Sequence, residues 1–247
     1  MNGILYFSST GNSLFVAQMA KRRLSGEIRY IPNYHGDGSE YDQIILVSPI
    51  YSFGLPAHVI KLLPQIRGSK VHFILTYGGM AAGADRLAYE YGLENGLDVH
   101  GVYTLRMVEN FTLTFSTPAL LNKLALRAVP KLLDGILTSI EQEQTHIPKP
   151  QKTKRQLFET NSGNWHLLAN DFSVSEDCIH CGKCVALCPS QNITLSDGHI
   201  QFGESCVACL GCYHRCPQKA IRYKNKKKRD RYINPDIKET DLGKDAL

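Results

Sequence analysis

The sequence contains the stretch CIHCGKCVALCP at residues 178–189 and a matching stretch, CVACLGCYHRCP, at residues 206–217. Both have the spacing Cys-x2-Cys-x2-Cys-x3-Cys-Pro, and the second begins 28 residues after the first. All eight cysteines of the 247-residue chain fall in these two stretches. Cysteines confined to one segment favour a metal site over a disulfide framework.

The spacing of the cysteines fits an iron–sulfur cubane. Three thiolates on a tight loop can bind three irons, but the fourth iron points away from that loop and needs a ligand from elsewhere. In chains with two such runs, the fourth Cys of each run ligates the other cluster. A zinc ribbon, the main alternative, would leave four of the cysteines without a purpose. We therefore predict two 4Fe–4S clusters, one held by Cys178, Cys181, Cys184 and Cys216, the other by Cys206, Cys209, Cys212 and Cys188.

The first 147 residues alternate strand-like with helix-like segments. Short apolar runs predict strands at 4–7, 27–31, 43–48, 71–77 and 99–107. Helical spacing of apolar residues predicts helices at 14–20, 56–66, 83–95 and 118–144, the last broken at Pro130. Strands that alternate with helices of this length indicate βαβ units. We expect an α/β fold with a doubly wound parallel sheet of five strands, followed by a small α+β module around the cysteines.

A loop of small and hydroxyl residues joins the first predicted strand to the first predicted helix. Its candidate site residues are Ser8, Thr10, Gly11, Asn12 and Ser13. Such a loop can direct several backbone N–H groups to one point, and the helix N-terminus adds the positive end of its dipole. The pattern indicates a phosphate site, with an ordinary helix N-cap as the alternative. It matches neither a Walker loop nor Gly-x-Gly-x-x-Gly.

Two later loops combine aromatic residues with glycine at the carboxyl edge of the predicted sheet. The candidate residues are Pro49, Ile50, Tyr51, Ser52, Phe53 and Gly54 in the first loop, and Thr76, Tyr77, Gly78 and Gly79 in the second. Ligands of open α/β sheets bind at this edge. An aromatic face can stack on a planar ring and glycine lets the backbone approach it, although aromatic residues that merely pack would give the same pattern.

The phosphate loop and the two aromatic loops, in this order, resemble flavodoxin over residues 1–147, and the cysteine runs resemble bacterial two-cluster ferredoxins over residues 172–222. The whole chain resembles the flavodoxin–ferredoxin fusion proteins found mainly in anaerobes. The resemblance implies FMN, with its phosphate on the first loop and its ring between the other two, where Tyr51 or Phe53 replaces the family's usual Trp. The only Trp, Trp165, lies beyond that domain. Residues 148–171 are then a linker and residues 223–247 a charged tail.

The implied function is electron transfer between the two clusters and FMN, as a low-potential relay to or from a partner enzyme. The alternative is a flavoenzyme that reduces a small molecule such as a quinone, so the sequence leaves open whether the chain is an enzyme. The space above the flavin distinguishes the two. An open pocket with convergent polar groups favours the enzyme, and a ring covered by the ferredoxin module favours the relay.

The charge distribution limits the partners that we expect, and the hydropathy limits the expected location of the chain. The net charge of +5 comes mainly from residues 219–231, which hold eight basic residues and one acidic residue. The basic run at 222–231 is either a docking site for an acidic redox partner or a solvated stretch, and we expect no nucleic acid. No stretch approaches the roughly 20 apolar residues that span a bilayer. The N-terminus lacks a basic signal region, so we expect the cytoplasm.

Overall fold

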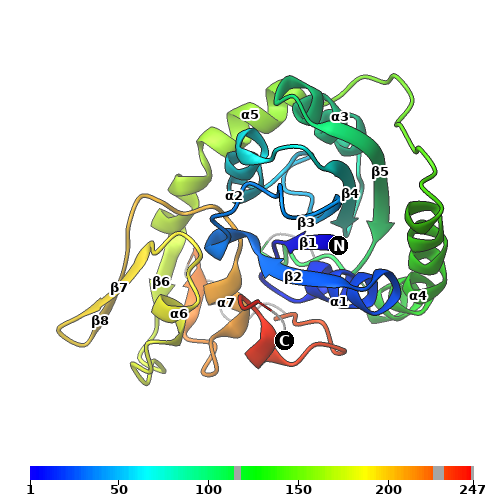
Figure 1. Ribbon diagram of the computed structural model, residues 1–247. Coiled ribbons are helices and arrows are strands. Elements are labelled where there is room, and N and C mark those ends of the chain that lie inside the picture. Colours follow the sequence, from blue (N-terminus) through cyan, green and yellow to red (C-terminus); the bar gives the residue numbers. More distant parts are fainter. Residues whose placement is uncertain (114–117, 225–230, 246–247) are drawn as a thin grey trace.

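The structure, a computed structural model, describes residues 1–113, 118–224 and 231–245 (Figure 1). Its main sheet consists of β1 (Asn2–Tyr6), β2 (Gly26–Tyr30), β3 (Gln43–Pro49), β4 (Lys70–Tyr77) and β5 (Asp98–Arg106). All neighbouring strands are parallel, and their order is β2-β1-β3-β4-β5. This is the flavodoxin-like order, in which the chain reverses its winding between β1 and β3. The predicted doubly wound parallel sheet is confirmed.

Helices cover both faces of this sheet (Figure 1). α1 (Asn12–Leu24) packs beside α4 (Ala119–Glu141) on one face, and α2 (Ala57–Leu62) and α3 (Ala84–Glu94) lie on the other. Two short 3-10 turns, η1 (Ile31–Asn33) and η2 (Leu63–Gln65), follow β2 and α2.

The prediction that Pro130 breaks the last helix is wrong, because α4 runs through it. Pro130 lies on the exposed face, where water can bond the carbonyl that loses its N–H donor. The buried side chains of Val129, Leu133 and Leu137, on both sides of Pro130 in the sequence, hold this part of the helix on the sheet domain.

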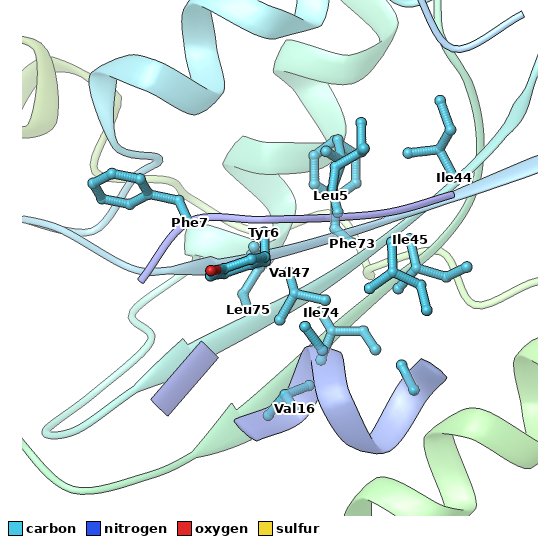
Figure 2. Packing of buried hydrophobic residues seen from close by; sticks show 14 of the residues in the cluster. Leu5, Tyr6, Phe7, Val16, Ile44, Ile45, Val47, Phe73, Ile74 and Leu75 are labelled. Carbon is cyan, nitrogen blue, oxygen red and sulfur yellow. The ribbon is translucent and has the colours of Figure 1, made fainter. Parts of the chain in front are cut away.

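The core lies on both faces of the central strands, as their continuous apolar runs predict. Leu5 and Phe73 point to one side of the sheet, and Ile74 and Val47 point to the other, toward Val16 of α1 (Figure 2). All five are fully buried. Burying one such side chain stabilises the fold by about 1.5–3 kcal/mol. The sheet is therefore a rigid base for the loops at its carboxyl edge.

The cysteine module contains two small antiparallel sheets and two short helices. β6 (Phe172–Val174) pairs with β9 (Ile221–Tyr223), and β7 (Ile193–Ser196) forms a hairpin with β8 (His199–Phe202). The short helices are α6 (Lys183–Ala186) and α7 (Gly211–Arg215). Left-handed backbone at His180 and Gly182 recurs 28 residues later at Ala208 and Leu210, so both cysteine loops have the same turns.

Two segments that the sequence marks as linker and tail contain structure. Residues 148–171 include α5 (Arg155–Gly163) and the 3-10 helix η3 (Trp165–Asp171). Residues 231–245, with the 3-10 turn η4 (Glu239–Asp241), pack back against the sheet domain and are called the C-terminal segment below. Most of the basic run, residues 225–230, lies outside the described residues. Of its ends, Arg222 pairs with Asp177 at 3.2 Å and Arg231 packs over the Tyr213 ring.

Candidate redox site

A cavity of about 810 Å³ lies at the carboxyl edge of the main sheet. The loops after β1, β3 and β4 form one side of it. Of the fifteen residues predicted to bind a cofactor on these loops, all except Gly11 and Gly54 line the cavity. The structure thus brings together three loops that are up to about seventy residues apart in the sequence, as expected for the carboxyl edge beside the switch point.

The loop after β1 leaves the amino end of α1 without a side-chain cap. The residue at the cap position is Gly11, with φ 100°, and no side chain bonds the first-turn amides. The Ser8 hydroxyl accepts the Gly11 N–H at 3.1 Å, and the Ser13 and Thr76 hydroxyls are bonded at 2.9 Å. Uncapped helix amides beside hydroxyl groups suit an anion without any Lys or Arg.

Two glycines allow close packing around the aromatic loops. A Cβ atom on Gly54 would overlap the Phe158 ring of α5, and one on Gly78 would overlap the backbone of Glu109. Tyr51 meets Trp165 edge to face, with ring centroids 6.0 Å apart. Burial, and then the nearby Cys209 thiol, raises the pKa of Tyr51, so its hydroxyl stays protonated.

The sequence did not predict the rest of the cavity lining. These residues come from the end of β5 and the stretch after it, from the start of α4, from α5 and η3, and from the second cysteine loop: Arg106, Val108, Glu109, Asn110, Phe111, Pro118, Asn161, Asn164, Trp165, Leu167, Leu168, Asp171, Ala208, Cys209 and Leu210. The apolar residues of the 158–168 segment were the available signal, but the Pro- and Lys-rich stretch before it indicated a linker. Trp165 therefore reaches the site from outside the predicted domain.

The structure places the cysteines in two groups of four. Cys178, Cys181, Cys184 and Cys216 line one small cavity. In the other group, burial first, and then the neighbouring thiols of Cys206 and Cys188, raise the pKa of Cys209 to about 12. Each loop thus receives its fourth cysteine from the other run. Among the described residues, no three His, Cys, Asp or Glu side chains converge on a single metal ion. A cubane does not need this, because each iron takes its own thiolate.

Cys188 and Cys216, the fourth cysteines of the two runs, accept matching hydrogen bonds. The Asn192 N–H donates to the Cys188 sulfur at 3.2 Å, and the Ala220 N–H donates to the Cys216 sulfur at 3.3 Å. These donors occur at the same position in both halves of the repeat. Hydrogen bonds to sulfur stabilise thiolate and are one means by which proteins tune iron–sulfur potentials.

The two cysteine loops differ in burial, and we call residues 178–188 the outer loop and residues 206–216 the inner loop. In the outer loop, Cys181 is exposed and Ile179 is 58% exposed. In the inner loop, Cys209 packs against the core of the sheet domain and Gly211 lies against Ser9 of the phosphate loop. The inner loop therefore separates the cavity from the rest of the cysteine module.

The C-terminal segment connects the inner loop to the phosphate loop. The Tyr232 hydroxyl donates to Asn12 Oδ1 at 2.7 Å, and the Asn234 N–H donates to the Thr10 carbonyl at 2.8 Å. The Tyr232 N–H donates to His214 Nδ1 at 3.1 Å, which leaves His214 Nε2–H to donate to the Asn110 carbonyl at 2.8 Å. The Asn12 side chain is thus engaged by protein groups, and its backbone N–H belongs to the uncapped first turn of α1.

A family model described as a 4Fe-4S dicluster domain matches residues 177–221. No curated protein matches the chain. Among solved structures, the chain is similar to the two-electron reduced flavodoxin of Megasphaera elsdenii, with 23% identity and a TM-score of 0.39 over 42% of this chain and 85% of that one. It is also similar to the FMN-bound flavodoxin of Fusobacterium nucleatum, with 19% identity and a TM-score of 0.42 over 58% of this chain and 98% of that one.

Because these TM-scores lie below 0.5, the flavodoxin-like fold rests on the strand order and not on the likeness. The predicted fusion of a flavodoxin-like domain with an iron–sulfur domain is confirmed by that order and by the dicluster match. An iron–sulfur domain of this kind supports a role in electron transfer. Within residues 1–113, 118–224 and 231–245, no helix combines the length and apolar character needed to cross a bilayer.

Proposed function

We propose that this chain is an electron relay that binds FMN and two 4Fe–4S clusters and passes electrons between them, to or from a partner enzyme. One observation carries the proposal. The cavity lined by the three predicted FMN loops is also lined by Ala208, Cys209 and Leu210 of the inner cysteine loop. A cluster ligand at the wall of a flavin cavity allows electron exchange without a separate carrier.

The residues present fit FMN. Its phosphate would bind the uncapped amides of α1, that of Asn12 included, and the hydroxyls of Ser8, Thr10 and Ser13, while Gly11 shapes the loop at the cap position. Its ring would lie between residues 49–54 and residues 76–79. Negative phosphate at a helix N-terminus is favoured by the dipole and by the free N–H groups. Bound FMN supplies a centre that exchanges one or two electrons, whereas each cluster exchanges one.

The residues around the cavity position and shield this exchange. Trp165, Leu168 and Leu210 contribute apolar side chains to the cavity wall. The inner group, Cys206, Cys209, Cys212 and Cys188, would hold the cluster next to the flavin. The outer group, Cys178, Cys181, Cys184 and Cys216, would hold the cluster nearer the surface, where a redox partner can reach it. The order of transfer is then flavin, inner cluster, outer cluster, or the reverse.

A flavoenzyme is the second candidate, and one observation favours it. Part of the cavity wall is polar, with Asn161, Asn164 and Asp171. Polar groups in an otherwise apolar pocket are typical of a small-molecule site. Anaerobic reoxidation of the reduced holoprotein by a panel of quinones distinguishes the two. A saturable rate that Asn161→Ala lowers supports the enzyme, and a rate linear in quinone concentration supports the relay.

The proposal is tested by counting cofactors. We expect anaerobically purified protein to contain about eight irons, about eight sulfides and one FMN per chain. Eight irons without flavin would remove FMN from the proposal and leave the clusters. Bound zinc without iron would contradict the relay altogether.

A further inference from the structure

Glu109 lines the cavity and bonds two backbone N–H groups of its wall. It follows β5 and faces the loop after β4, where its backbone fills the space beside Gly78 that a Cβ would need. Its carboxylate accepts the Gly79 N–H at 3.1 Å and the Phe111 N–H at 2.8 Å. All three residues line the cavity. One carboxylate therefore takes two of the backbone donors available at this wall.

The charge of Glu109 is not neutralised by an ion pair. Among the described residues, the ion pairs of Lys, Arg and His use other acidic partners, and Arg106, the cation that lines the same cavity, is not bonded to Glu109.

We propose that Glu109 sets the reduction potential of the flavin, an inference that rests on FMN binding as proposed above. Each electron that enters the flavin adds negative charge unless a proton follows it. A fixed carboxylate in the cavity wall repels that charge. It also occupies the Gly79 and Phe111 N–H groups, which could otherwise stabilise the reduced ring. Glu109 thus makes the flavin a stronger reductant and favours electron flow from the flavin toward the inner cluster.

The test is the flavin potential of the full-length holoprotein with Glu109→Gln. Glutamine has the same length and keeps an oxygen that can accept an N–H, but it carries no charge. We expect reduction of the flavin to become at least tenfold more favourable, a rise of about 59 mV in a one-electron couple. The measurement is an anaerobic spectroelectrochemical titration of the flavin absorbance.

Three further variants separate charge from structure. Glu109→Ala is the second uncharged variant and is expected to shift the potential in the same direction, and it replaces Glu109→Gln if that protein does not fold. Glu109→Asp keeps the charge, and its equilibrium constant for flavin reduction is expected to stay within threefold of the wild-type value. Asp134→Asn removes one exposed charge on α4, away from the cavity, and is expected to cause no shift. A purely structural role would instead weaken FMN binding in all Glu109 variants and leave the potential unchanged.

Failure of this inference is distinct from failure of the proposed function. Suppose that wild type binds FMN and that the equilibrium constant for flavin reduction in both uncharged variants is within threefold of the wild-type value. Glu109 then does not set the potential, and the proposed relay is unaffected. If wild type binds no FMN, both proposals are overturned.

Discussion

The outer and inner cysteine loops share their motif but have different surroundings. Both have left-handed turns at matched positions and a matched N–H donor to the fourth cysteine. The outer loop faces solvent through Cys181 and Ile179, whereas the inner loop buries Leu210 and Tyr213 against the rest of the chain. The same ligand geometry can therefore provide either a contact to the outside or a connection inside the protein. The residues between the ligands decide which.

Those intervening residues explain the difference. The inner loop has Leu210, Gly211, Tyr213, His214 and Arg215 where the outer loop has Gly182, Lys183, Val185, Ala186 and Leu187. Leu210 accepts left-handed backbone, which costs roughly 1–2 kcal/mol for a residue with a Cβ, and its side chain is buried. Lys183 reaches Glu239 at 2.6 Å near the surface, whereas its counterpart Gly211 has no side chain and lies against Ser9. Large and anchored side chains thus mark the loop that faces the cavity.

The difference between the inner and outer loops is tested most directly by removing one cluster at a time. We expect Cys209→Ala to lower the rate of electron exchange between the flavin and the remaining cluster by more than about tenfold, ~1.4 kcal/mol of barrier. Cys181→Ala should leave exchange between flavin and inner cluster unchanged. The measurement is the relaxation of flavin and cluster absorbance after flash photoreduction of the flavin. Equal losses in the two variants would contradict the assignment of inner and outer clusters.

The contact of the inner loop with the phosphate loop can be tested by exchanging the matched residues. A methyl group at 211 would lie 3.6 Å from Ser9 Cβ, and because Gly211 is buried, a lysine side chain there would have to displace its neighbours. We expect Gly211→Lys to destabilise the interface by about 1–3 kcal/mol and to slow electron exchange several-fold. The reverse change, Lys183→Gly, removes only a partly exposed ion pair and is the matched control. Similar urea midpoints for both variants would show that the inner loop is not packed as described.

Breaking the hydrogen bond between the C-terminal segment and the phosphate loop should have a smaller effect than the changes above. Tyr232→Phe removes the hydroxyl that bonds Asn12 of the phosphate loop and leaves the ring. One such hydrogen bond contributes about 1 kcal/mol, so we expect FMN to bind roughly fivefold more weakly, as measured by fluorescence titration. Tyr34→Phe removes an exposed hydroxyl bonded to Glu40, far from the cavity, and should not alter binding. An unchanged FMN affinity in Tyr232→Phe would mean that the segment does not support the phosphate loop.

The contrast between the loops also shows what the sequence could predict. Cysteine spacing specifies ligand geometry, and apolar runs specify the buried parallel strands, because both follow from short-range rules. Which loop faces the cavity depends on packing between distant segments, such as Gly211 against Ser9, and leaves no periodic signal. Trp165 and Tyr232 were missed for the same reason. Trp165 follows a Pro- and Lys-rich stretch and Tyr232 lies in a highly charged one, and both reach the site only through tertiary contacts.

The smallest predicted effect concerns a histidine that touches neither loop. His72 of β4 is buried beside Tyr103, and burial, followed by the charges of His100 and Lys70, lowers its pKa to about 4, whereas Asp98 and Glu143 act in the opposite direction. Between pH 6.5 and 4 the unfolded chain binds the proton and the folded chain does not, so stability falls as the pH falls through this window.

At pH 6 the loss from His72 is below about 1 kcal/mol relative to pH 7. We expect His72→Gln to reduce the difference between the urea midpoints at pH 7 and pH 6, measured anaerobically by circular dichroism on the holoprotein. Cluster absorbance in the folded baseline should not change, because the site lies at β4 and β5, away from both cysteine loops. An equal pH dependence in wild type and variant would place the titrating group elsewhere. A change in cluster absorbance would instead show that the sheet domain and the cysteine loops are coupled beyond the contacts of the inner loop.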